Sequence, residues 1–288
     1  MSRLDLYTSV SEAAAAVVIR QYSTSFGLAS GLLDAPVRRD IANIYALVRV
    51  ADEVVDGVSE DAGLSREDAA QSLDELEAQT VQAFELGFST NPIVHACATT
   101  ARKVGFGREL TEPFFASMRA DLTQTVHDDD SFERYVYGSA EVIGLMCLRV
   151  FLYGHDRTPQ QHDQLERGAR ALGAAFQKVN FLRDLADDYE TLGRSYFPHV
   201  DIAKFDEEQK LLILDDIDAE LRISRASLPL LPRRSRRAVA LAHCLFAELA
   251  RRLRDTPADH ILTARVSVPT AVKLRLAAAS LAGRMPQA

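Results

Sequence analysis

The sequence predicts an all-α protein folded as a single domain over residues 1–288. Apolar residues recur at helical spacing along almost the whole chain. Residues that start and stop helices separate these stretches, such as Asp34 followed by Ala35-Pro36, and Gly87. No strand-like alternation, internal repeat or linker is evident in the sequence. These observations together favour one helical domain.

The individual helices follow from these start and stop signals. Ser11-Glu12 opens an Ala/Val-rich helix, and proline in the first turn after Asp34 opens another, which Gly57 ends. Ser65-Arg66-Glu67-Asp68 starts a helix with a heptad-like apolar pattern. Proline and glycine at 91–92, 105–107, 154–155 and 256–257 separate the later helices. The expected helices cover residues 11–20, 35–55, 65–86, 92–104, 109–125, 131–152, 159–188, 206–225, 235–254 and 268–282.

Composition limits the class of protein and its partners. The formal charge of −8 argues against nucleic acid as the main partner. No apolar run reaches the roughly 18–20 residues needed to cross a bilayer, and the first residues lack the pattern of a signal peptide. We therefore expect a cytoplasmic protein. Cys97, Cys147 and Cys244 are scattered in apolar surroundings, so we expect buried free thiols rather than a zinc site.

Two short acidic motifs carry the clearest chemical information. Asp52 and Asp56 are four residues apart, and so are Asp184 and Asp188. If the segments are helical, each pair lies on one helix face. Both pairs are in apolar surroundings, where carboxylates need a compensating partner. A hard divalent cation such as Mg²⁺ supplies one, whereas a solvated helix face is the alternative reading for either pair alone.

Neighbouring residues favour the first reading. Arg49 lies one helical step before Asp52, and Arg183 directly precedes Asp184. Gln177 and Asn180 extend the second acid pair into a polar stripe on an otherwise apolar helix, which indicates a lined cavity. Arginine beside acid pairs suits a diphosphate, because its guanidinium grips phosphate oxygens while metal ions bridge the others.

Glycine also recurs inside two expected helices, at 138 and 144 and at 168 and 173. Glycine in a helix interior costs roughly 1 kcal/mol relative to alanine. Either close helix packing or room for a bulky ligand would explain its presence there.

Six ordered motifs make the chain resemble the squalene/phytoene synthase family, and bacterial phytoene synthases in particular, from about Tyr22 to Lys273. The motifs are Tyr22-Ser23-Thr24-Ser25-Phe26, Tyr45-x3-Arg49-x2-Asp52-x3-Asp56, Tyr135-x-Tyr137-Gly138-Ser139-Ala140-x3-Gly144, Gln177-x2-Asn180-x2-Arg183-Asp184-x3-Asp188, Gly193-Arg194-x-Tyr196-Phe197-Pro198 and Arg265-Val266-x-Val268-Pro269.

The resemblance implies an isoprenoid-synthase fold, a bundle of helices around a central cavity. It also implies roles for the residues that match. Metal ions, Mg²⁺ with Mn²⁺ as an alternative, would be held by Asp52, Asp56, Asn180, Asp184 and Asp188. Diphosphate would be bound by Arg49 and Arg183, with Ser23 and Ser25 contributing, while Tyr45 and Gln177 contact substrate and Tyr135 lines the reaction centre.

The implied activity is the head-to-head condensation of two geranylgeranyl diphosphates to phytoene, through a cyclopropyl diphosphate and without NADPH. The alternative is a dehydrosqualene or squalene synthase that uses farnesyl diphosphate, in the latter case with NADPH. Small residues after the first motif, Gly27, Ala29 and Ser30, favour the longer chain. Non-catalytic relatives of the same fold lose motif aspartates, whereas this chain keeps all four. A helical scaffold that binds anions would not require two acid–arginine motifs.

Carbocations need a dry, aromatic-lined cavity. The candidates for its wall are Tyr45, Tyr135, Tyr137, Phe176 and Phe181, with aromatic core packing as the alternative for at least half of them. Two positions depart from the family pattern. Tyr22 stands where many relatives carry histidine, and Phe246 stands where many carry a tyrosine that contacts substrate.

Between Arg222 and Arg254 the chain has nine arginines and one acid, Glu248. The densest cluster is Arg233, Arg234, Arg236 and Arg237, which we expect in a loop after the apolar residues 228–231. A solvated face explains these arginines. Alternatively, they make weak, salt-sensitive, peripheral contact with the inner face of an anionic membrane. The sequence leaves the oligomeric state open.

Overall fold

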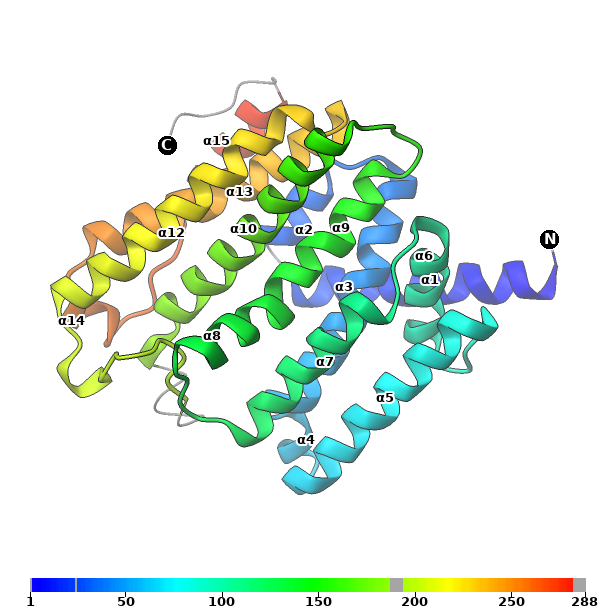
Figure 1. Cartoon of the computed structure of the whole chain (residues 1–288), viewed down its shortest axis with the longest axis horizontal. Helices are drawn as coiled ribbons and strands as arrows, with labels where there is room; N and C mark the ends of the chain where they lie inside the picture. The colour runs from blue at the N-terminus through cyan, green and yellow to red at the C-terminus, as the bar shows by residue number, and fades with distance from the viewer. Residues whose placement is uncertain (1, 24, 187–193, 282–288) are drawn as a thin grey trace.

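Long helices lie side by side in the computed structural model (Figure 1), which describes residues 2–23, 25–186 and 194–281. Side chains from several of these helices line a cavity inside the bundle. Within those residues the structure contains no β-strand, only an isolated bridge between Val126 and Ser195. The predicted all-α class is therefore confirmed. The α-helices are α1 (Arg3–Tyr22), α2 (Ser25–Ser30), α3 (Ala35–Val55), α4 (Val58–Asp61), α5 (Arg66–Leu86), α6 (Pro92–Val104), α7 (Arg108–Thr123), α8 (Asp129–Val136), α9 (Val142–Leu152), α10 (Pro159–Arg183), α12 (Glu207–Ser227), α13 (Arg233–Asp255), α14 (Ala258–Ile261) and α15 (Thr270–Leu281).

Local capping accounts for most of the helix boundaries that the sequence predicts. α3 begins after Asp34 with proline in its first turn. α5 begins at a capping box in which the Ser65 and Asp68 side chains each accept a hydrogen bond from the other residue's backbone N–H. It ends at Gly87, whose φ of 72° places it in the left-handed region.

Several expected boundaries were wrong. α1 begins at Arg3 rather than at residue 11, because Ser2 and Asp5 form a capping box ahead of the alanine-rich stretch. The helix expected over 131–152 is interrupted by a π-helical turn, Tyr137–Glu141. α10 ends at Arg183 and residues 185–186 are again helical, so the helix expected over 159–188 is broken at Asp184, while 187–188 lie outside the described residues. The expected basic loop is instead the start of α13, which begins at Arg233.

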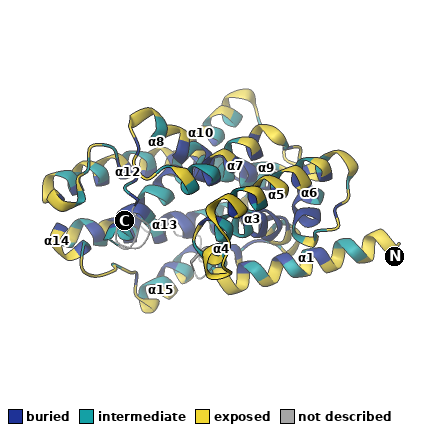
Figure 2. Cartoon of the chain, turned by 90° about the horizontal axis from the view of Figure 1, so that it is seen from below, coloured by how far each residue is buried: buried dark blue, intermediate teal, exposed yellow. Residues whose placement is uncertain are grey.

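Two large apolar clusters divide the bundle. One joins α3, α5, α6, α7 and α9 around the fully buried Phe114 and Phe115. The other joins α8, α10, α12 and α13 around Leu214 and Ile217. The helices of these two groups lie on opposite sides in Figure 1, with α9 and α10 adjacent between them. α1 lies along one edge of the bundle with an exposed outer face (Figure 2).

The helical glycines allow close packing between neighbouring helices. A Cβ at Gly144 would lie 2.4 Å from the Ala169 carbonyl oxygen, and one at Gly173 would lie 2.5 Å from that of Ala140. Both glycines also line the central cavity. Of the two explanations, the structure supports close packing, and the same contacts shape the cavity wall.

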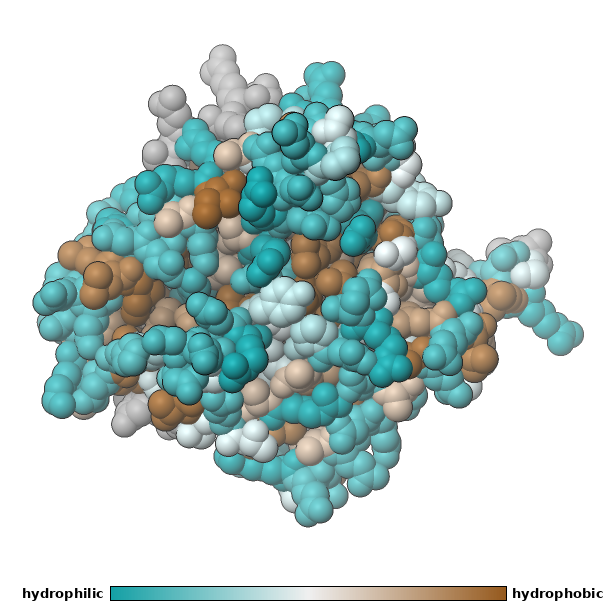
Figure 3. All heavy atoms as spheres, in the orientation of Figure 1, coloured by the Kyte–Doolittle hydropathy of each residue, from teal (hydrophilic) through white to brown (hydrophobic). Residues whose placement is uncertain are grey.

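One helical stretch among the described residues, Asp129–Leu152, is long and apolar enough by composition to cross a membrane. Half of its most apolar window is buried inside the bundle, as in the core helix of a globular fold. The stretch also contains Glu141, which forms an ion pair with Arg170 of α10. Hydrophilic side chains dominate the face drawn in Figure 3, and apolar ones form separate patches.

Candidate active site

A polar pocket of about 290 Å³ brings the two acidic motifs together. α3 and α10 contribute most of its lining, and the segments around Asp121, Tyr135 and Arg194 complete it. The predicted site residues that line this pocket are Arg49, Asp52, Asp56, Tyr135, Gln177, Asn180, Arg183 and Asp184. Asp188 lies outside the described residues, as does the side chain of Ser25.

On the α3 side, Arg49 is held by three neighbours. Its Nη1 donates a hydrogen bond of 2.5 Å to Asp52, and its Nη2 donates to Glu53. The Tyr22 ring covers the guanidinium, with Cζ 4.7 Å from the ring centroid. Burial and the neighbouring Asp56 carboxylate raise the pKa of Asp52 above its usual range, although Arg49 and Arg194 oppose this. The two carboxylates therefore repel each other, although about a third of each side chain is exposed (32% and 38%).

On the α10 side, Asp184 is the residue at which the helix ends. The Arg183 Nε donates a hydrogen bond of 2.8 Å to Asp184. The Arg265 guanidinium approaches the same carboxylate from the segment before α15, with Nε 2.9 Å from Oδ1. Asp184 thus bridges two cations. Because the helix ends here, the predicted polar stripe lies on a continuous helix only as far as Asn180.

Asp121 and Arg194 form the buried floor of the pocket. The Tyr135 hydroxyl lies 2.8 Å from both carboxylate oxygens of Asp121. Arg194 donates to Asp56 at 3.1 Å, to the Tyr196 hydroxyl at 3.2 Å and to the main-chain carbonyls of Val55 and Asp121 at 3.0 Å. Burial raises the pKa of Asp121 to about 7 and that of Tyr135 well above its usual value. Tyr135 is therefore a protonated hydroxyl at neutral pH.

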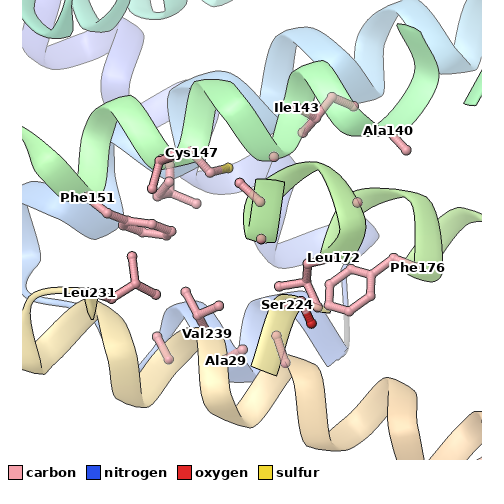
Figure 4. A pocket seen from close by; sticks show the side chains of 18 of the residues that line it. Ala29, Ala140, Ile143, Cys147, Phe151, Leu172, Phe176, Ser224, Leu231 and Val239 are labelled. Carbon is pink, nitrogen blue, oxygen red and sulfur yellow. The ribbon is translucent and has the colours of Figure 1, made fainter. Parts of the chain in front are cut away.

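An apolar cavity of about 320 Å³ lies next to the polar pocket, and Gln177 and Asn180 line both. Tyr45 and Phe176 line the cavity near this junction, with Ala29 and Ser30 of α2 also in the wall. Figure 4 shows Phe151, Leu231 and Val239 gathered at one end, away from Phe176 and Ala140. The volume falls in the range of ~300–1,000 Å³ typical of ligand sites.

The remaining predicted residues have more varied positions. Ser23 ends α1 and lies outside both cavities, but its hydroxyl accepts a 3.0 Å hydrogen bond from the Gly27 N–H and contacts the Tyr45 side chain. Tyr135 and Phe181 line the polar pocket rather than the apolar one. Tyr137 lines neither; its ring packs on the core under Arg170. Phe246 stacks on Phe176, with ring centroids 3.7 Å apart.

Four residues of the site had no predicted role: Asp121, Arg194, Tyr196 and Arg265. Three of them belong to sequence motifs that carried the resemblance, so a signal existed for these. Asp121 lies in an unremarkable amphipathic segment of α7, and only the fold places it against Tyr135. The three cysteines are free, as expected, and burial raises the pKa of Cys97 and Cys147 to about 12.

The side chains of the pocket show whether the site suits a divalent metal ion. Within the described residues, no three His, Cys, Asp or Glu side chains converge closely enough to hold a metal ion. The expected set includes Asp188, which is outside those residues. The crowded Asp52 and Asp56 carboxylates, one with a raised pKa, are a donor set that a divalent cation would relieve. These residues therefore fit the predicted ion.

A sequence profile of squalene/phytoene synthases matches residues 19–271. The chain belongs to the squalene/phytoene synthase family, whose members are prenyltransferases. The predicted family resemblance is thus confirmed.

Individual members of this squalene/phytoene synthase family show the range of similarity. The chain is 30% identical over 253 residues to a 15-cis-phytoene synthase of Enterobacter agglomerans, covering 79% of this chain and 80% of that one. It is 29% identical to a 4,4'-diapophytoene synthase of Staphylococcus haemolyticus, covering 70% and 66%. The crystal structure of a dehydrosqualene synthase matches with a TM-score of 0.78 at 22% identity, over 96% of this chain and 97% of that one. At that identity the match shows the fold alone, which is the predicted isoprenoid-synthase bundle.

Proposed function

We propose that this protein is a phytoene synthase, the first enzyme of carotenoid biosynthesis. It would condense two geranylgeranyl diphosphates head to head, through a cyclopropyl diphosphate, to phytoene. The observation that carries the proposal is that two cavities of different character lie next to each other. A pocket lined by two acid–arginine motifs shares the lining residues Gln177 and Asn180 with an apolar cavity. This arrangement suits a substrate with a diphosphate head and a long hydrocarbon tail.

The described arginines account for binding of the head group. Arg49 and Arg183 lie on opposite sides of the polar pocket, and their guanidinium groups match phosphate oxygens geometrically. Mg²⁺, held by Asp52 and Asp56 and by Asn180, Asp184 and Asp188, would neutralise the charge that develops on the departing diphosphate. Arg183 and Arg265 occupy the Asp184 carboxylate in this structure, so one or both would move when the ion binds.

The surrounding residues control the carbocation. The apolar wall excludes water, which would quench a cation. Tyr45 and Phe176 line the cavity, and their aromatic rings would stabilise a cation there. The Asp121–Tyr135 hydrogen bond fixes the Tyr135 ring at the boundary of the polar pocket, so that its hydroxyl does not swing into the reaction space.

A dehydrosqualene synthase acting on farnesyl diphosphate is the second candidate. It is supported by the similarity to the staphylococcal 4,4'-diapophytoene synthase, which is almost as strong as that to the phytoene synthase. The names of most of the similar relatives favour the longer substrate, and so does the small side chain of Ala29 in the cavity wall.

Product analysis tests the proposal. Purified protein is incubated with Mg²⁺ and either the C15 or the C20 diphosphate, with and without NADPH, and the hydrocarbon is identified. We expect phytoene from the C20 substrate at a rate that NADPH does not change, because the last step is loss of a proton. A strict requirement for NADPH with a reduced product, or turnover of the C15 substrate alone, would reject it.

A further inference from the structure

A second, basic pocket of about 430 Å³ lies beyond the far end of the apolar cavity. Leu231 lines both spaces and is buried, so its side chain forms part of the wall between them. The pocket lies between two parts of the chain, the segment from α9 to the start of α10 and the turn between α12 and α13. It is lined by His155, Arg157, Gln161, Pro229, Leu230, Leu231, Pro232, Arg233 and Arg236.

The charges in this pocket are unbalanced. Three guanidinium groups line it and, among the described residues, no carboxylate does. Arg157 donates a 3.0 Å hydrogen bond to the Leu230 carbonyl, and Arg236 donates one of 2.9 Å to that of Leu231. These bonds orient the two side chains without neutralising them. Arg233 has no hydrogen bond or ion pair with any residue that the structure describes.

The neighbouring arginines behave differently. Arg234 forms an ion pair with Asp34 at the start of α3 and does not line the pocket. Arg237 does not line the pocket either. The structure thus divides the basic cluster of the sequence: two of its four arginines face a common cavity, and Arg157 and His155 join them from a segment some 80 residues away in the chain. Like charges gathered in one concave site favour an anionic ligand.

We propose that this pocket binds the phosphate group of an anionic membrane lipid. Planar guanidinium groups match phosphate oxygens in pairs. α13, which is 23 residues long, starts at Arg233 without a side-chain cap, so its free N–H groups add to the positive potential. Pro229, Leu230 and Pro232 add apolar surface beside the arginines, which suits a headgroup attached to acyl chains better than a free anion.

The position of the pocket suggests why lipid binding there would be useful. This part of the inference rests on the proposed function. Gln161 in the basic pocket and Asn180 in the polar pocket lie 19 residues apart on α10, or about 28 Å along the helix. A lipid headgroup here would place the far end of the apolar cavity at the bilayer. An insoluble hydrocarbon product would then have to pass only the wall around Leu231 to reach lipid.

The test measures vesicle binding by the whole chain without substrate, so its result does not depend on whether the protein makes phytoene. Arg233→Gln removes the arginine of the pocket that makes no hydrogen bond or ion pair with the described residues. Arg66→Gln, an exposed arginine at the start of α5, makes the same change of charge at the opposite end of the bundle from the start of α13 (Figure 1). Co-sedimentation is compared on phosphatidylcholine vesicles with and without phosphatidylglycerol, at low and physiological salt.

We expect binding only to the anionic vesicles, weakened about fivefold by Arg233→Gln and unchanged by Arg66→Gln. Equal effects of the two substitutions would mean that vesicle binding depends only on net charge, and would overturn the proposal that this pocket binds lipid. A parent protein that does not bind anionic vesicles at low salt would overturn it too. A calorimetric titration with inorganic diphosphate forms the second arm. Binding of that ion that depends on Arg233, without vesicle binding, would overturn the assignment to a lipid.

Discussion

The Arg194 guanidinium lies 3.1 Å from the Asp56 carboxylate although 138 residues separate them in the chain. It also bonds the main chain at Val55 and Asp121, so one side chain ties the end of α3 to α7 and to the segment before α12. We expect Arg194→Gln to lower the free energy of unfolding by about 3–5 kcal/mol, because it leaves the buried Asp121 carboxylate without its cation.

Urea unfolding at pH 8 checks this value. Arg119→Gln is the matched control, since Arg119 pairs with Asp74 and Glu77 but is 38% exposed, and it should cost at most about 1 kcal/mol. Equal losses from the two substitutions would contradict the role given to Arg194.

Asp121 should make stability depend on pH. Burial raises its pKa in the folded protein to about 7 from 3.8. The folded state therefore holds this proton more tightly than the unfolded chain does. Its contribution to stability is complete below about pH 4 and is lost as the pH rises to about 7, a change of about 4 kcal/mol. Asp121→Asn keeps the acceptor for Tyr135 and removes the titration.

The stability of the asparagine variant relative to the parent should thus be higher at pH 8 than at pH 5, and this difference between the two proteins is the margin that is measured. Urea midpoints at the two pH values measure this margin. A margin that is constant or that shrinks towards pH 8 would mean that folding does not raise the pKa of Asp121.

Close packing at α10 predicts a cost for one added methyl group. Gly173→Ala would place a Cβ 2.5 Å from the Ala140 carbonyl oxygen, and relief of that contact should cost about 1–3 kcal/mol. Gly27→Ala is the control, because the nearest described atom that its Cβ would meet is the Ser23 Cβ at 3.9 Å. Thermal unfolding should show the first variant destabilised and the second unchanged or stabilised, as expected for alanine in an unobstructed helix.

The proposed metal role predicts that Asp52→Asn and Asp184→Asn abolish turnover while the protein stays folded. Each substitution removes a carboxylate from the polar pocket, and for Asp52 it also relieves crowding with Asp56. Asp163→Asn, an exposed position on α10, is the control. Steady-state turnover and the thermal midpoint are measured together. Near-parental activity in either pocket variant would reject the role.

The proposed tail site predicts that Val239→Phe shifts substrate preference. Val239 lies with Phe151 and Leu231 at the far end of the apolar cavity (Figure 4), and a larger ring there would shorten the space. We expect turnover of the C20 diphosphate to fall at least about tenfold relative to that of the C15 diphosphate, while Val239→Ala leaves the ratio unchanged. An equal fall for both substrates would indicate that the tail does not lie in this cavity.

The sequence predicted the helical class and most helix boundaries because capping residues and glycine act locally. Ser65 and Gly87 need only their own neighbours to start and stop α5. The early end of α10 at Arg183 could not be predicted in this way. There the Asp184 carboxylate bridges Arg183 and Arg265, and Arg265 belongs to a segment 81 residues further along.

In the site, too, contacts within one helix could be predicted from the sequence, and contacts between helices could not. Asp52 and Arg49 share one helix, so their spacing revealed the pair. Asp121 and Tyr135 come from different helices, and their contact exists only because α7 and α8 pack together. The basic cluster was visible as composition. Which of its arginines face a cavity depended on Asp34 and on the turn at Leu231, far apart in the chain.

The π-helical turn at Tyr137–Glu141 rotates the side chains of α9 about the helix axis relative to those of α8. A π turn adds about one residue to a helix, equivalent to a rotation of about 100°. Tyr135, before the turn, faces the polar pocket, whereas Ile143 and Cys147, after it, face the apolar cavity. In an uninterrupted α-helix, Ile143 and Cys147 would lie on a different side of the helix from Tyr135. The extra residue thus allows one helical stretch to line both the polar pocket and the apolar cavity, which is where the proposed substrate would place its diphosphate and its hydrocarbon tail.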